Sequence, residues 1–249
     1  MRHRVGRPVI AAALVLMVGA TLLAQRGGFR TYNGNPQYDG KFQFVRMSYA
    51  FFGRQQAPWA HDYSRGEENF LKIFNAVSNA PMHVTESSVM AFDDPEIFKN
   101  PVIYLVEPGY WEMTPEQAKN FHDYIVKGGF LIVDDFPQWA WSQFDMQISK
   151  SFPDLQWQSI DITHPIFHSF FELESLDLPI VYPQLGGKPI FRALFENNDS
   201  TKRMYAIANY QNDISEYWEG SPLTSFKPVA EDNEAFKFGI NEFIYGITH

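Results

Sequence analysis

Near the middle of this sequence, an apolar run, a capped helix and a second apolar run follow one another closely. Residues 102–106 read VIYLV and residues 130–133 read FLIV, and such continuous runs are typical of strands covered on both faces. Between them, Thr114-Pro115-Glu116-Gln117 has the capping threonine, the proline and the glutamine that begin a helix, and Gly128-Gly129 ends it. This strand–helix–strand unit predicts two parallel strands joined by a right-handed crossover.

Other segments fit the same α/β pattern. The spacing of apolar residues predicts helices over 64–78 and 232–247. Further extended segments are expected over 42–49, 82–85, 157–160, 190–195 and 204–208. The intervening parts of 136–190 and 209–231 are expected to be irregular. We therefore expect one α/β domain over residues 42–249, preceded by a flexible lead-in over residues 25–41.

Residues 1–24 have the pattern of a secretory signal peptide. Arg2, Arg4 and Arg7 precede an apolar run over residues 9–24, after which polar residues return. The run is shorter than the roughly 18 residues of a spanning helix, so we predict cleavage after Ala24 and a periplasmic or secreted domain. Leu22 is large for its position, which leaves an uncleaved membrane anchor as the alternative. No later segment is long and apolar enough to span a membrane, so we expect no membrane span in the mature chain.

Composition excludes several classes of function. None of the 249 residues is cysteine, which excludes a thiol nucleophile and a Cys-ligated zinc or iron–sulfur site. Without residues 1–24, the 20 basic residues fall by three to 17 against 29 acidic ones, a formal charge of −12. Such a surface repels phosphate backbones, so we expect no nucleic-acid partner. No Gly-x-Gly-x-x-Gly, phosphate-loop or Gly-x-Ser-x-Gly pattern occurs, and we expect no cofactor.

Several motifs taken together resemble one bacterial family. They are Phe44-Val45-Arg46, Tyr104-Leu105, Glu107-Pro108-Gly109, residues 124–131, Asp134-Asp135, residues 164–167 and residues 245–249. Over residues 42–249 the set resembles the DUF4159 family, which has no known function and is similar in fold to class I glutamine amidotransferases. The resemblance implies a flavodoxin-like three-layer sandwich with a mostly parallel sheet. It also implies that Asp134-Asp135-Phe136 occupies the turn where an active amidotransferase has its cysteine, so thioester chemistry is excluded.

Two carboxylates follow the second apolar strand. Asp134 and Asp135 stand at the edge of the sheet where ligands bind in open α/β folds, and either could bind a metal or act as a general base. Adjacent residues on a strand point in opposite directions, so the two form a matched pair only if the turn redirects one. The alternative is that one caps the following segment and the other is solvated.

The loop after the first apolar strand should border the same crevice. Gly109 allows close approach of the backbone to a ligand, and Tyr110 and Trp111 could stack on a sugar-like ligand. The alternative is a turn whose rings pack on the core. The candidate ligand-binding residues are Glu107, Gly109, Tyr110, Trp111, Trp139 and Asn209.

A second, weaker candidate is a metal site in residues 161–168. His164 and His168 are four residues apart and would share a face of a helical turn opened by Pro165, with Asp161 as a third ligand. The glutamate of a hydrolytic zinc helix is missing. The alternative is a turn in which His164 bonds to local backbone.

Two functions of different classes fit these features. The first is a non-catalytic, exported module of the cell envelope that binds an unknown small molecule or envelope protein. The second is a metal- or carboxylate-dependent hydrolase of an envelope carbohydrate or peptide, with Asp134, Asp135 and His164 as candidate catalytic residues. The sequence leaves open whether the chain is an enzyme.

Overall fold

The computed structural model describes residues 34–249 apart from residues 62, 178–187 and 220–228, with residues 229–231 described by their backbone alone. Residues Asn35–His249 form one compact unit. The predicted signal peptide and most of the predicted lead-in lie outside the described residues. Within the described part of the chain, no helix combines the length and apolar character needed to cross a membrane.

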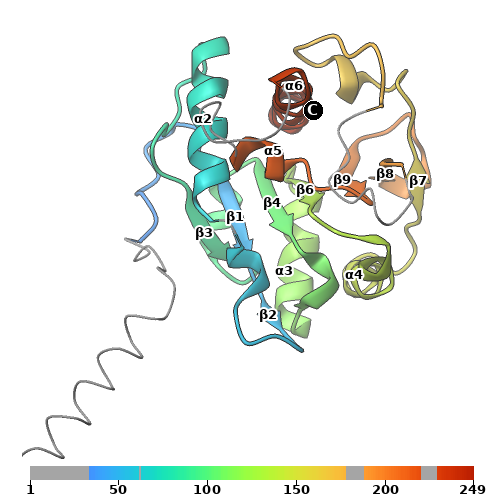
Figure 1. Cartoon of the computed structure of the whole chain (residues 1–249). Helices are drawn as coiled ribbons and strands as arrows, with labels where there is room; N and C mark the ends of the chain where they lie inside the picture. Colours follow the sequence, from blue (N-terminus) through green and yellow to red (C-terminus); the bar gives the residue numbers. More distant parts are fainter. Residues whose placement is uncertain (1–33, 62, 178–187, 220–228) are drawn as a thin grey trace, which may run out of the picture. The chain divides into compact units, whose positions relative to one another are not determined.

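A seven-stranded sheet runs through the unit in the order β3-β1-β4-β6-β9-β8-β7 (Figure 1). The strands are β1 (Val45–Ser48), β3 (Ser88–Ala91), β4 (Val102–Val106), β6 (Phe130–Asp134), β7 (Trp157–Ser159), β8 (Ile190–Phe195) and β9 (Met204–Tyr210). β3, β1, β4, β6 and β9 are parallel, and β8 and β7 extend one edge antiparallel. The parallel strands have the flavodoxin-like order 2-1-3-4-5, which confirms an α/β fold with a mostly parallel sheet.

The predicted strand–helix–strand unit consists of β4, α3 (Pro115–Val126) and β6. Thr114 and Gln117 form a capping box, with the Gln117 amide donating to Thr114 Oγ1 at 3.2 Å and the Thr114 amide donating to Gln117 Oε1 at 3.1 Å. β4 and β6 pair in register, so that Val106 lies beside Asp134. The loops that follow the two strands therefore start side by side.

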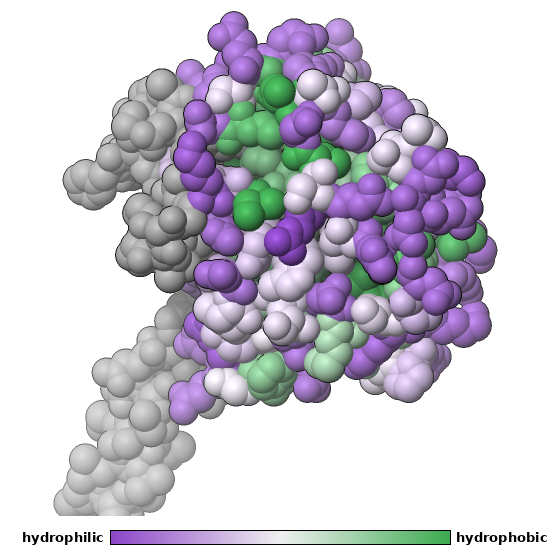
Figure 2. Space-filling model, turned by 90° about the vertical axis from the view of Figure 1, so that its right-hand side faces the viewer, coloured by the Kyte–Doolittle hydropathy of each residue, from purple (hydrophilic) through white to green (hydrophobic). Residues whose placement is uncertain are grey.

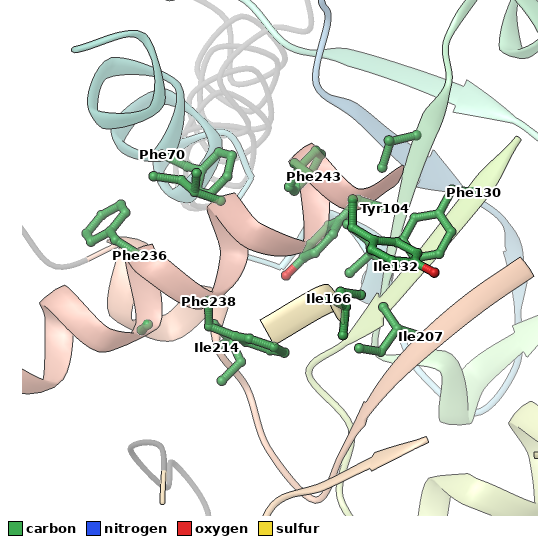
Figure 3. Close-up of a cluster of buried hydrophobic side chains, with 14 of the residues drawn as sticks. Phe70, Tyr104, Phe130, Ile132, Ile166, Ile207, Ile214, Phe236, Phe238 and Phe243 are labelled. Atoms are coloured by element: carbon green, nitrogen blue, oxygen red, sulfur yellow. The ribbon is translucent and has the colours of Figure 1, made fainter. Parts of the chain in front are cut away.

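Helices cover both faces of the sheet, and the arrangement is a three-layer sandwich. On one face lie α2 (Arg65–Val77), α5 (Ser215–Glu219) and α6 (Val229–Thr248), and on the other lie α3 and α4 (Trp141–Ser149). Figure 3 shows Phe70 of α2 and Phe243 of α6 in one cluster with Tyr104 and Ile132 of the sheet. The alternation of side chains along β4 and β6 puts one set of residues in each core.

The structure corrects the sequence prediction in two irregular segments. α4 lies within residues 136–190, and it is held by Trp141, Phe144 and Ile148, whose spacing of three and four packs against the sheet. α5 lies within residues 209–231, and its first turn depends on a carboxylate from a distant strand.

Two short pairings also differ from expectation. The segment 82–85 makes a single bridge, between Met82 and Phe42, and the edge strand beside β1 is β3, which begins at Ser88. β2 (Ala50–Phe51) pairs with β5 (Trp111–Glu112) in a small antiparallel ribbon that the sequence did not predict. Pairings of two residues have too little pattern to be found from sequence.

The surface on the β7 side of the sheet carries a group of apolar side chains. Figure 2 shows hydrophobic residues together in the upper half of this face, surrounded by hydrophilic ones. After β7, the half-buried Ile160, Ile162 and Phe171 pack against the core, and Phe170 is exposed. Most of the largest fully buried side chains are aromatic, so the high aromatic content serves mainly the core.

Candidate functional site

The two adjacent aspartates at the end of β6 have different surroundings. Asp134 is fully buried and accepts hydrogen bonds from the Tyr104 hydroxyl at 2.7 Å and from the backbone N–H groups of Ile214 and Ser215 at 3.1 and 2.9 Å. Burial raises the pKa of Asp134 even though these donors favour its charged form. Asp134 therefore holds the start of α5 and is closed to solvent.

Asp135 turns away from that interior because its backbone is left-handed, with φ of 52°. Glu107, after β4, is also left-handed, with φ of 46°, and its N–H donates to the Asp135 carbonyl oxygen at 3.1 Å. Such conformations are uncommon for residues other than glycine, so both turns are held by their surroundings. The buried Tyr49 hydroxyl contributes, lying 2.9 Å from the Val106 carbonyl oxygen and 2.8 Å from that of Glu107.

A pocket of about 130 Å³ opens where these two turns meet. It is lined by Arg54, Glu107, Gly109, Tyr110, Asp135, Phe136, Pro137, Trp139 and Ala140. Arg54 Nη1 lies 3.0 Å from Glu107 Oε2, and its guanidinium lies 5.0 Å from the Tyr110 ring. The pocket thus combines two carboxylates and a cation with aromatic rings. We call it the strand-end pocket.

The aromatic wall of the strand-end pocket is formed by Tyr110 and Trp139. Their rings are 5.2 Å apart in an edge-to-face arrangement, and Trp139 is 56% exposed. Gly109 makes room for this wall, because a Cβ atom there would lie 2.6 Å from Trp139 Cζ3 and 2.7 Å from the Ala140 Cβ. An exposed tryptophan held by a neighbouring ring can stack on a flat ligand surface.

His61 also faces the two carboxylates. Its Nδ1 lies 3.5 Å from Glu107 Oε1 and 3.9 Å from Asp135 Oδ2, and one ligand atom from each residue falls within 4.8 Å of the others. These three residues could hold a metal ion. Neither His61 nor Arg54 belongs to a motif that sequence reasoning could recognise, because both lie in the irregular loop between β2 and α2.

A buried ion pair lies on the face of the sheet that α2, α5 and α6 cover. Arg46 of β1 pairs with Glu67 of α2, and both are almost fully buried. Arg46 Nη1 also donates to the carbonyl oxygens of Trp59 and His61, each at 3.3 Å. The buried ion pair therefore fixes the backbone of the loop that carries His61.

A further buried carboxyl group, that of Asp213, lies near Asp134 and Asp135. Asp213 accepts hydrogen bonds from Ser215 Oγ and the Glu216 amide, each at 2.9 Å, and caps α5. Burial, together with the charges of Asp135 and Asp134, raises the pKa of Asp213 well above its usual range.

Two of the residues predicted to bind a ligand lie elsewhere. Trp111 is fully buried and stacks on Phe92 in the core between the sheet and α3. Asn209 of β9 is fully buried beside Glu242 of α6, and burial raises the pKa of Glu242 well above its usual range. Neither side chain lines the strand-end pocket.

Asp161, His164 and His168 each have local partners. Asp161 accepts from the amide and hydroxyl of Thr163, His164 Nδ1 accepts from the Ile166 amide at 3.2 Å, and His168 Nδ1 lies 2.7 Å from Glu172 Oε2.

His164 lies far from the strand-end pocket, near the other end of β6. The His164 ring packs on Tyr245, which packs on Phe130 at the start of β6. His164 is thus at the opposite end of β6 from Asp135. Within the described residues, the cluster of ligating side chains forms at His61, Glu107 and Asp135 instead.

Comparison with known proteins places this site within a family but gives it no role. A family model described as "Domain of unknown function (DUF4159)" matches residues 43–247, which includes all the residues that line the strand-end pocket. A search of curated proteins finds no match.

Proposed function

The chain belongs to the DUF4159 family, and we propose that its domain is a non-catalytic module that binds a carbohydrate in the strand-end pocket. The observation that carries the proposal is the exposed ring of Trp139 beside Glu107 and Asp135. Sugars present an apolar ring face that stacks on an aromatic side chain, and hydroxyl groups that bond to carboxylates and guanidinium groups. The pocket offers both kinds of contact at the carboxyl ends of parallel strands, where ligands bind in such folds.

We also propose that the domain is an amidotransferase-like fold without the thiol chemistry. The flavodoxin-like strand order and the left-handed turn at Asp135, directly after β6, support this assignment. The absence of cysteine means that an amide cannot be attacked by sulfur at this turn. Binding without catalysis is the simplest function left to such a site.

The proposed setting is the cell envelope. Its support is the signal-peptide pattern of residues 1–24, and the predicted location is the periplasm or the outside of the cell. Fractionation of cells that express the full chain, with sequencing of the mature N-terminus, tests this part. Protein that stays in the cytoplasm with residues 1–24 intact would contradict it.

Calorimetric titration with monosaccharides and envelope oligosaccharides tests the binding function. We expect saturable binding by the wild-type chain and at least tenfold weaker binding by Trp139→Ala. Phe170→Ala is the matched control, because Phe170 is an exposed ring on the segment after β7, away from the pocket. Absence of binding to every sugar, or equal loss in both variants, would overturn the proposal.

A hydrolase is the second candidate function, favoured by one observation. Glu107 and Asp135 face the same pocket, where one carboxylate could act as general base toward water while the other orients the substrate. This function predicts release of product from a bound oligosaccharide and its loss in Asp135→Asn. Binding that continues without product formation in the wild-type chain would exclude the hydrolase for that ligand.

A further inference from the structure

We infer that His61, Glu107 and Asp135 form a binding site for a divalent transition-metal ion, beside the strand-end pocket that Glu107 and Asp135 line. The inference rests on the same pocket as the proposed function but requires no carbohydrate. It assigns a role to His61, which no sequence motif indicates.

The distances fit a common ion. Two ligands that each lie about 2.1 Å from a metal ion can be at most ~4.2 Å apart. His61 Nδ1 lies 3.5 Å from Glu107 Oε1 and 3.9 Å from Asp135 Oδ2, both within that limit. All three ligand atoms lie within 4.8 Å of one another, so small rotations of the three side chains can bring them around one ion. Imidazole and carboxylate ligands together suit zinc, manganese or iron.

The backbone of each ligand residue is already held in place. Arg46 fixes the His61 carbonyl from the interior, and the Tyr49 hydroxyl fixes that of Glu107. The Glu107 amide donates a hydrogen bond to the Asp135 carbonyl oxygen, so the backbones of these two ligand residues are joined directly. Such preorganisation lowers the entropy that would be lost when the ion binds.

The charge around the site favours a cation. One carboxylate oxygen of Glu107 contacts Arg54, which is partly exposed, and the other oxygen faces His61. Asp135 Oδ2 approaches the same His61 ring, so two carboxylates face the site. The buried cation Arg46 is already paired with Glu67. A divalent ion would reduce the repulsion between the Glu107 and Asp135 carboxylates.

The three protein ligands leave coordination positions open to a bound molecule. Glu107 and Asp135 line the pocket whose other wall is Tyr110 and Trp139. Sites with three protein ligands and open positions are those that bind water or substrate directly. A sugar stacked on Trp139 would have hydroxyl oxygens within reach of such an ion.

Titration of the full chain with MnCl₂ and ZnCl₂ tests the inference, using calorimetry for both ions and electron paramagnetic resonance for Mn²⁺. We expect one ion per chain, and at least tenfold weaker binding in His61→Gln, Glu107→Gln and Asp135→Asn. His168→Gln is the matched control, because His168 also contacts a carboxylate but lies away from the pocket. Circular dichroism checks that each variant is folded.

Failure of this inference and failure of the proposed function give different results. Absence of saturable binding of both ions by the wild-type chain, or wild-type affinity in folded His61→Gln, would overturn the metal site. Trp139→Ala should lose sugar binding and keep the metal, because Trp139 supplies no ligand. A chain that binds metal and no sugar would support the inference and contradict the carbohydrate proposal.

Discussion

The Tyr104 hydroxyl donates a 2.7 Å hydrogen bond to Asp134 Oδ2 inside the protein, and the same oxygen accepts the Ser215 amide at 2.9 Å. Through this atom β4, β6 and the start of α5 are joined. The bond explains why one of two adjacent aspartates is structural. It leaves Asp135 as the aspartate of this pair that lines the strand-end pocket.

Replacement of either partner in this hydrogen bond should destabilise the fold, and the two replacements should differ in cost. Tyr104→Phe should lower the free energy of unfolding by about 1–2 kcal/mol, because Asp134 keeps its two backbone donors. Asp134→Asn should lower the free energy of unfolding more, by about 2–4 kcal/mol, since the NH₂ group of asparagine cannot accept a hydrogen bond from a backbone N–H. Urea unfolding measures both, with the exposed Tyr38→Phe as control. Equal effects of Tyr104→Phe and Tyr38→Phe would contradict this role.

Glu242 should make stability fall with rising pH. Burial raises its pKa well above the ordinary value of 4.5, so the folded protein holds a proton that the unfolded chain releases. The stabilisation is complete below about pH 4.5 and is lost as pH rises toward the folded pKa. Glu242→Gln should therefore gain stability relative to wild type by up to about 1.4 kcal/mol per pH unit above that point.

Urea unfolding at several pH values between about 5 and 8 measures this difference. Exposed Glu174→Gln is the control and should follow the wild-type pH dependence within error. Parallel curves for wild type and Glu242→Gln would show that Glu242 titrates normally.

The buried ion pair of Arg46 and Glu67 should be sensitive to loss of one partner. Arg46→Met should cost about 3–5 kcal/mol, because it leaves Glu67 buried without a cation. The double variant Arg46→Met with Glu67→Leu should recover much of that loss, since neither charge remains. Thermal or urea unfolding compares the three proteins. A double variant no more stable than Arg46→Met would argue against the ion pair as the cause.

Gly109→Ala should alter the strand-end pocket more than the fold. The added methyl group would overlap Trp139 and Ala140, so the tryptophan ring must move. We expect at least tenfold weaker sugar binding, with a loss of stability of about 1–3 kcal/mol. Calorimetry and urea unfolding measure the two effects. Wild-type affinity in Gly109→Ala would mean that the position of Trp139 does not matter for the ligand.

Alanine usually gives a more stable protein than glycine, and the left-handed turn at Asp135 should reverse this order of stability. Asp135→Gly should be more stable than Asp135→Ala by about 1 kcal/mol, because glycine adopts positive φ without strain. At Asp145, inside α4, the order should be the opposite by a similar amount. Urea unfolding of the four variants tests the reversal. The same order at both positions would contradict the left-handed conformation.

Much of the central fold follows from local sequence. Strands β4 and β6 are continuous apolar runs, and α3 begins at a capping box. α4 was missed although Trp141, Phe144 and Ile148 have helical spacing, because aromatic residues dominate a short segment. α5 depends on Asp134, which is 80 residues before Ile214 in the chain, and no local pattern reports such a contact.

The candidate site was only partly accessible to sequence. Glu107, Tyr110, Asp135 and Trp139 follow strands β4 and β6, and the rule that ligands bind at strand ends placed them together. Asn209 also lies near the end of a parallel strand, yet its side chain faces Glu242 of α6. A residue's position near a strand end does not determine on which face of the sheet its side chain lies.

The α/β unit around α3, the absence of thiol chemistry and the acidic, aromatic character of the strand ends could all be predicted from the sequence. These follow from residue type and from neighbours along the chain. The meeting of His61 and Arg54 with Glu107 and Asp135 follows from the three-dimensional packing alone. Their meeting depends on the pairing of β1, β4 and β6, on the bonds from Arg46 to the His61 loop, and on two left-handed turns. Such long-range packing leaves no local pattern in the sequence.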